Sequence, residues 1–118
     1  MLRSMHEMGI AQAALRQIAA QAQEAGATHV HRIVLRIGTL SGVDPDALRF
    51  AMEIALPESS AAGAEFAIEI VQARARCEKC SGEFTPADGF LFECPQCHAL
   101  GGTILQGKEL DLASLEIS

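Results

Sequence analysis

Two Cys-x-x-Cys units decide the fold of this chain: Cys77-Glu78-Lys79-Cys80 and Cys94-Pro95-Gln96-Cys97, with 13 residues between Cys80 and Cys94. Two residues between cysteines allow one tight turn to present both sulfurs to a single ion, and two such turns complete a tetrahedral site. Four protein ligands close the coordination sphere and leave no position for a catalytic water. The sequence therefore predicts a structural Zn²⁺ bound by Cys77, Cys80, Cys94 and Cys97.

Other uses of these cysteines explain less of the pattern. Two disulfides require an oxidising compartment, which nothing in the sequence indicates. The run from Cys94 to His98 also matches the Cys-x-x-Cys-His pattern of haem attachment, but haem leaves the first Cys-x-x-Cys unit without a role. Four thiolates on a dication leave a net charge of −2, and we expect the nearby cations to offset it: Arg74, Arg76 and Lys79.

Outward from the cysteines, hydrophobic periodicity predicts two helices and three strands. Residues 4–25 form an amphipathic helix with an apolar stripe, and Asp44-Pro45 begins a second helix because Asp is a good N-cap and Pro suits the first helical position. The expected strands are residues 30–37, 65–72 and 109–117. The fold class is α/β: a small mixed three-stranded sheet with two helices, and a zinc-ribbon-like lobe inserted before the last strand. We expect residues 1–72 and 108–118 to form one domain and residues 73–107 the zinc-binding domain.

Composition narrows the class of partner. The formal net charge is −6, and 49% of the residues are hydrophobic, without Trp or Tyr. An acidic chain without stacking aromatics on a basic face argues against nucleic-acid binding. The sequence shows neither a signal peptide nor a membrane span, so we expect a cytoplasmic protein. No convincing nucleophile–base pair is present, so we expect no enzymatic activity.

A second group of candidate metal ligands lies near the amino terminus, at His6 and Glu7. Imidazole and carboxylate donors suit Ni(II) or Cu(II), and Asp44 could join them from a neighbouring loop. A structural interpretation competes with this one: Ser4 and Glu7 have the spacing of a capping box, and Asp44 is a sound N-cap. The residues alone favour the capping interpretation.

Several motifs together resemble a known family. They follow one another along the chain as Met5-His6-Glu7-Met8, Ile37-Gly38-Thr39-Leu40-Ser41-Gly42-Val43, Asp44-Pro45-Asp46-Ala47-Leu48-Arg49-Phe50, the two Cys-x-x-Cys units and Gly107-Lys108-Glu109-Leu110. In this order the chain closely resembles the HypA/HybF family of hydrogenase nickel-maturation proteins, from Met5 to its end.

The resemblance implies a nickel metallochaperone with a structural zinc site. It makes His6 the principal nickel ligand, Glu7 its neighbour and Asp44 a less certain third. The implied partners are the nickel-insertion GTPase of the hydrogenase maturation system and the hydrogenase large-subunit precursor. Some members also support urease, so urease accessory proteins are further candidates, and a homodimer remains open.

One departure from the family concerns the amino terminus. The family motif normally begins the protein, where a terminal amine can bind nickel, whereas Met1-Leu2-Arg3-Ser4 precedes it here. Translation could start at Met1 or at Met5, and we expect the longer form to bind nickel differently, because a peptide nitrogen loses its proton less readily than an amine. Sequence alone leaves the roles of His29, His31 and His98 open, and a zinc-ribbon module that binds protein or nucleic acid remains the alternative function.

Overall fold

The computed structural model describes residues 2–86 and 92–118, with side chains from His6 onward. The chain divides into two compact units. The helix–sheet unit comprises Met1–Arg36, Val43–Glu69 and Asp111–Ser118, and the cysteine unit comprises Ile37–Gly42 and Ile70–Leu110. The domain boundaries expected from the sequence remain a prediction about which segments fold independently.

The helices and strands predicted around the cysteine insert are confirmed, with small shifts at their ends. In chain order they are α1 (Leu2–Glu24), β1 (Val30–Gly38), α2 (Pro45–Ala55) with a short 3₁₀ turn η1 (Leu56–Glu58), β2 (Glu65–Val71) and β6 (Leu110–Ile117). Helix α1 begins at Leu2, two residues earlier than expected. Ser4 therefore lies within its first turn and not at the N-cap, so the capping-box interpretation is wrong.

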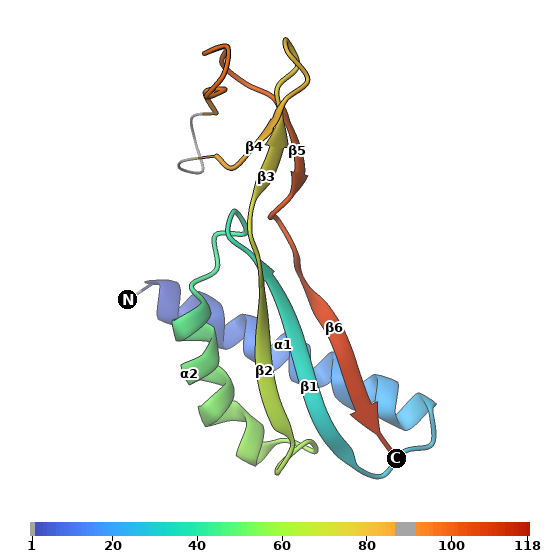
Figure 1. Cartoon of the computed structure of the whole chain (residues 1–118). Coiled ribbons are helices and arrows are strands. Elements are labelled where there is room, and N and C mark those ends of the chain that lie inside the picture. Colours follow the sequence, from blue (N-terminus) through green and yellow to red (C-terminus); the bar gives the residue numbers. More distant parts are fainter. Residues whose placement is uncertain (1, 87–91) are drawn as a thin grey trace. The chain divides into compact units, whose positions relative to one another are not determined.

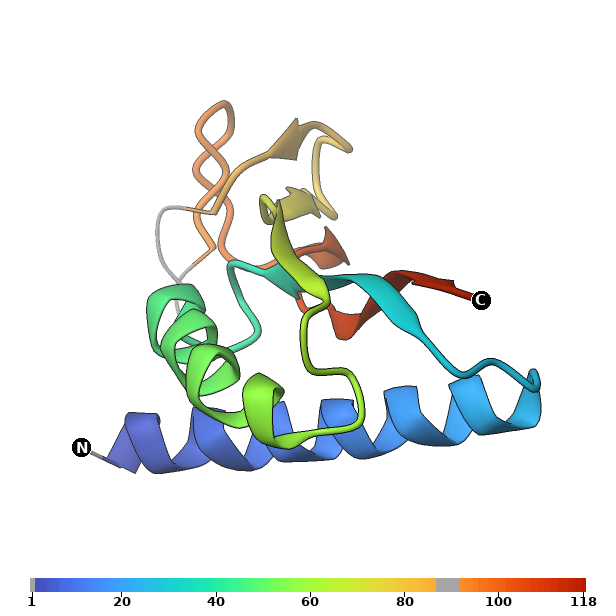
Figure 2. The ribbon, with the colours of Figure 1, turned by 90° about the horizontal axis from the view of Figure 1, so that it is seen from below.

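The principal sheet is mixed and has the order β2-β1-β6. Figure 1 shows β1 and β2 running in the same direction, as expected for two strands joined through a helix. At the other edge, the backbones of His29 and Ser118 exchange two N–H···O bonds of 3.0 Å, which is an antiparallel pairing. Both helices lie on the same side of the sheet (Figure 2).

The core of the helix–sheet unit lies between the helices and β1. The apolar stripe of α1 is buried as its three- and four-residue spacing predicts, and so is the inner face of α2. The buried side chains are Ala11, Leu15, Ile18 and Ala22 from α1, Ile33 and Leu35 from β1, and Leu48, Ala51 and Met52 from α2. One charged side chain in this unit is also fully buried, that of Glu7.

The cysteine segment contains a second small sheet that the sequence did not predict. It is three-stranded with the order β4-β3-β5, from β3 (Arg74–Arg76), β4 (Glu83–Phe84) and β5 (Thr103–Gln106). Strands of two to four residues carry too few alternating positions to give a periodic signal.

Two glycines of the family-like motifs pack backbone against backbone. The Gly38 N–H donates to the Glu109 carbonyl at 2.8 Å, and the Gly107 carbonyl accepts from the Leu40 N–H at 2.7 Å. A Cβ atom on Gly38 would overlap the Gly107 carbonyl, and Gly107 also has a φ of +120°. Both positions therefore require glycine.

Candidate metal centres

The two Cys-x-x-Cys units form matching turns, here called the first knuckle (residues 77–82) and the second knuckle (residues 94–99). In the first, Cys77 N–H donates to the Gly82 carbonyl at 2.8 Å and Ser81 N–H to the Cys77 carbonyl at 2.9 Å. The second repeats both bonds at 2.9 Å, from Cys94 to Ala99 and from His98 to Cys94. Ser81 and His98 have φ angles of 65° and 63°, the left-handed region. Each backbone turn thus holds its two sulfurs on one side.

The four sulfurs converge on one point. All four Sγ atoms lie within 4.8 Å of one another. Cys77 and Cys97 Sγ are 3.5 Å apart, and Cys80 and Cys94 Sγ are 3.6 Å apart. A tetrahedral ion with Zn–S bonds near 2.3 Å requires sulfurs about 3.8 Å apart, whereas a disulfide requires about 2.05 Å. The spacing fits a Cys₄ zinc site, and the four cysteines are free thiols.

Backbone N–H groups favour the thiolate form at the first cysteine of each knuckle. The N–H groups of Cys80 and then Lys79 lower the pKa of Cys77 from 9.0 to about 6. In the second knuckle, the Cys97 N–H lowers the pKa of Cys94. At Cys80, the Gly82 N–H also lowers the pKa. The Cys94 thiol and desolvation raise it, and the net result is a pKa of about 11. Because metals bind thiolates, the lowered pKa values predispose Cys77 and Cys94 to bind a metal ion.

A small apolar core supports the sulfurs. Cys77 and Cys94 are buried with Ala75 and Phe84. Partly buried side chains pack against this group: Phe92, Cys97, Ala99 and Ile104. Cys80 is exposed. This apolar core is small, so we expect a bound ion to contribute substantially to the stability of the lobe.

The basic side chains near the cysteines have a different partner from the one expected. Arg74 and Arg76 both form ion pairs of 3.5 Å with Glu83. Lys79 contributes its backbone N–H to Cys77, as described above. Backbone N–H groups therefore favour the thiolates of Cys77 and Cys94, while the arginines connect strands β3 and β4.

At the amino-terminal site, Glu7 joins α1 to the start of α2. Its Oε2 accepts a hydrogen bond of 3.0 Å from the Asp44 N–H. Its Oε1 is buried and has no hydrogen-bond partner among the described residues. A buried carboxyl oxygen without a partner is costly, which makes it a candidate for an additional ligand.

Asp44 caps α2 as predicted. Its Oδ1 accepts from the N–H groups of Asp46 at 3.0 Å and Ala47 at 3.4 Å. This arrangement uses one oxygen for the cap and leaves Oδ2 for another ligand. The sequence-based expectation that one residue could serve both purposes is therefore compatible with the geometry.

His6 precedes Glu7 on α1 and is exposed to solvent. Among residues with described side chains, the cysteine quartet is the only group of three or more His, Cys, Asp or Glu donors close enough to hold one ion. In this conformation the donors of His6, Glu7 and Asp44 therefore do not converge as the cysteines do. A nickel site there requires movement of His6, and its ligand set remains a prediction.

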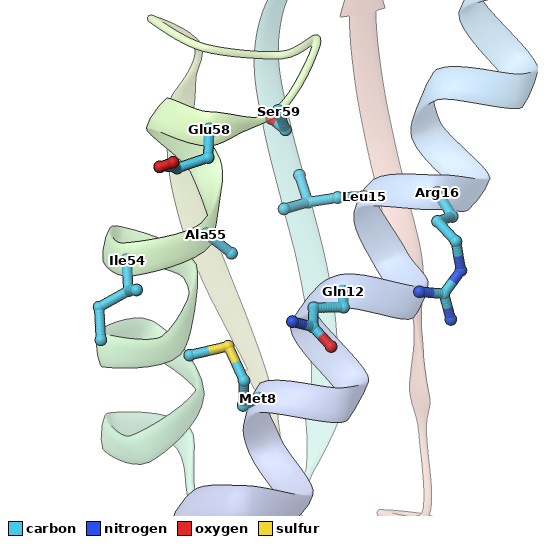
Figure 3. Close-up of a pocket in the computed structure, with 8 residues that line it drawn as sticks. All are labelled: Met8, Gln12, Leu15, Arg16, Ile54, Ala55, Glu58 and Ser59. Atoms are coloured by element: carbon cyan, nitrogen blue, oxygen red, sulfur yellow. The ribbon is translucent and has the colours of Figure 1, made fainter.

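An open groove of about 540 Å³ runs between α1 and α2. Met8 and Leu15 extend from α1 toward α2, which contributes Ile54 and Ala55 (Figure 3). The hydroxyl in the groove is used locally, because Ser59 Oγ donates to the Leu56 carbonyl at 2.7 Å and accepts from Ala61 N–H at 3.1 Å. The lining offers an apolar surface and not an activated nucleophile. In the described part of the chain, no helix has the length and apolar character needed to cross a bilayer.

The fold and the cysteine site together define a metal-binding protein with an α/β layer and a four-cysteine lobe. Comparison with known proteins identifies the particular family. The chain belongs to the HypA family: the family model described as "Hydrogenase/urease nickel incorporation, metallochaperone, hypA" matches residues 5–117.

Curated relatives and solved structures agree with this family. The Hydrogenase maturation factor HypA of Chloroflexus aggregans is 42% identical over 112 residues, covering 95% of this chain and 98% of the relative. The protein of the same name from Picosynechococcus is 41% identical over 113 residues, covering 96% and 99%. A solution structure titled as the Ni metallochaperone HypA from Helicobacter pylori matches with a TM-score of 0.65 and 28% identity, covering 94% of this chain and 96% of that one.

Proposed function

We propose that this chain carries Ni(II) at its amino-terminal site and delivers it for maturation of [NiFe] hydrogenase, while Cys77, Cys80, Cys94 and Cys97 hold a structural zinc ion. The family supplies the general role, and the single observation that carries the nickel site is the Glu7 carboxyl. It is fully buried, bonded to Asp44 by one oxygen and unpartnered at the other within the described residues.

The proposed nickel ligands are His6, Glu7 and Asp44. Glu7 Oε1 and Asp44 Oδ2 are the carboxyl oxygens left over from the hydrogen bond and the helix cap. His6 is exposed and adjacent, so its imidazole can reach the ion after the first turn of α1 opens. Because α1 begins at Leu2, His6 lies just beyond its first turn, so releasing His6 breaks helical hydrogen bonds and costs part of the binding energy.

Glu7 also limits how far the helix opens. Its hydrogen bond to Asp44 fixes α1 one residue after His6, so the ion is taken up by a mobile residue beside a fixed one. Moderate affinity follows, because part of the binding energy is used to rearrange the turn. Moderate affinity suits a carrier that must release its ion.

Delivery requires partners. The proposed acceptors are the nickel-insertion GTPase and the hydrogenase large-subunit precursor, with urease accessory proteins as a second client system. Nickel follows the general Irving–Williams trend and has no affinity advantage over copper, so selection depends on geometry and on the partner. The zinc lobe contributes a rigid surface for docking.

Substitution of His6 tests the proposal. His6→Ala should lower the affinity of the tight nickel-binding step at least about 100-fold, while zinc content and the melting temperature stay unchanged because His6 is exposed. Calorimetric titration with Ni(II) and metal analysis measure both, with the exposed helix substitution Gln17→Ala as the matched control. Unchanged nickel stoichiometry and affinity in His6→Ala would refute the proposal. A chain shortened to begin at Met5, titrated alongside, tests whether a free amine there strengthens binding.

The alternative, a zinc-ribbon module for nucleic acid, has little support from the described residues. Its basic cluster is partly neutralised, because Arg74 and Arg76 both pair with Glu83. A binding assay with nucleic acid across salt concentrations distinguishes the two functions, because nucleic-acid binding weakens steeply with salt.

A further inference from the structure

A pair of histidines lies at the start of β1, outside both metal centres described above. The rings of His29 and His31 stack with their centroids 6.1 Å apart and their planes within 10° of parallel. The two residues are two positions apart on an extended backbone, so they share one face. Both are exposed to solvent.

Each ring is oriented by a hydroxyl group. Thr28 Oγ1 lies 2.9 Å from Nδ1 of His29, and Ser118 Oγ lies 2.7 Å from Nε2 of His31. When the hydroxyl oxygen accepts, the bonded ring nitrogen carries the proton. The remaining nitrogen, Nε2 of His29 or Nδ1 of His31, then has a free lone pair, which is the form that binds metals.

The backbone beneath the pair is held in place. The His29 and Ser118 backbones exchange two hydrogen bonds of 3.0 Å, and the Thr28 N–H also donates to the Ser118 carbonyl at 2.9 Å. The start of β1 and the end of β6 lie side by side as a result (Figure 1). The two rings therefore project from a fixed edge of the sheet, and binding one ion requires both exposed side chains to rotate and rearrange their hydroxyl hydrogen bonds.

We propose that His29 and His31 form a second, weaker site for a borderline divalent cation such as Ni(II) or Cu(II). Two imidazole donors suit these ions, and the positions left open are filled by water or by a small chelating ligand. Because two protein ligands leave the ion largely solvated, it exchanges quickly. Such a site collects the ion from solution and does not retain it.

This site is separate from the one proposed at His6. Both lie in the helix–sheet unit. Glu24 lies eighteen positions after His6 on α1, a rise of about 27 Å at 1.5 Å per residue. One ion cannot contact both sites, so each can be removed without the other, and this inference does not rest on the function proposed above.

Titration in the His6→Ala background tests the second site alone. Ni(II) or Cu(II) should still produce one weak binding step, with the first changes in the NMR signals of the His29 and His31 rings. His29→Asn and His31→Asn should each weaken that step at least about 10-fold, because the second donor binds intramolecularly once the first is bound. Thr28→Val, which removes a hydroxyl while keeping its shape, should weaken it roughly 10-fold or less.

The controls separate the possible results. The same Asn substitutions in the chain that retains His6 should leave the tight nickel step unchanged. If neither Asn variant alters the weak step, or if the ion broadens only one of the two rings, the stacked histidines are a surface contact and the proposal is overturned. Failure of His6→Ala to lose the tight step would count against the proposed function and not against this pair.

Discussion

The cysteine lobe and the amino-terminal end of α1 differ in how completely the fold supplies donor atoms. In the lobe, two knuckles with the same hydrogen bonds and the same left-handed residues bring four sulfurs within 4.8 Å of one another. At the end of α1, one buried carboxyl is in place, and the exposed His6 has to move.

This difference corresponds to permanent and transferable binding. Four preformed protein ligands leave no open coordination position, so we expect a bound ion to exchange slowly. A site with one fixed ligand and one mobile ligand can pass through partly bound states in which an acceptor replaces His6 first. Under the proposed function, this difference in preorganisation would distinguish a resident ion from a carried one, before any difference in affinity is considered.

The largest expected effect comes from breaking the preformed site. Cys94→Ser should abolish zinc binding and unfold the cysteine unit, because zinc-binding free energies of about 10–16 kcal/mol are folding free energy in small lobes. Metal analysis should show almost no zinc, and amide NMR signals from residues 70–86 and 92–110 should collapse toward unfolded positions. The signals of α1 and α2 should remain dispersed.

Pro95→Ala is the matched control for this experiment. Pro95 lies between two ligands in the second knuckle but is exposed and supplies no sulfur. The Pro95→Ala variant should retain one zinc per chain. Retention of full zinc content and a native melting curve by Cys94→Ser would contradict the assignment of the resident ion.

The sequence predicted the principal α/β layer well for a physical reason. Its helices and strands are long enough for their apolar residues to repeat several times, and Asp44-Pro45 begins α2 where cap chemistry requires it. The sheet of the cysteine lobe was missed because β4 has only two residues and β3 only three. There the two knuckle turns, which leave no periodic signal, hold the segment together.

The candidate sites were predictable to different degrees. Spacing alone was sufficient for the cysteines, because two tight turns leave the sulfurs few other arrangements. The sequence placed Asp44 near Glu7 only as a candidate ligand, and it gave no sign of their hydrogen bond, which joins residues 37 positions apart through a side chain and a backbone amide. The capping box was wrongly predicted for the same reason, because the Ser4–Glu7 spacing does not reveal that the Glu7 side chain is buried and bonded to Asp44.

A pair of substitutions at Glu7 separates its structural contribution from its proposed metal ligation. Glu7→Ala should destabilise the helix–sheet unit by about 2–4 kcal/mol, because it leaves a cavity and an unpaired Asp44 N–H. Glu7→Gln keeps an acceptor for that N–H without a negative charge, so the unfolding free energy should fall by less than about 1 kcal/mol or rise. Denaturant unfolding measures both.

Nickel titration of the same two variants sharpens the comparison between the sites. Both should bind nickel more weakly, since neither has a carboxylate to offer. Normal nickel affinity in Glu7→Gln, with native stability, would mean that Glu7 only connects α1 to the start of α2 and does not bind the ion.

The smallest expected change in stability is at Asp44, where one residue is proposed to cap a helix and bind an ion. Asp44→Ala should lower the unfolding free energy by about 1 kcal/mol through loss of the cap, whereas Asp44→Ser should lower it by only a few tenths, because Ser is also a good N-cap. Neither variant retains a carboxylate, so both should weaken nickel binding equally. A nickel affinity that falls in Asp44→Ala but is normal in Asp44→Ser would assign Asp44 to the helix cap alone. The ion would then depend on His6 and Glu7, and the contrast with the four-ligand lobe would be greater than proposed.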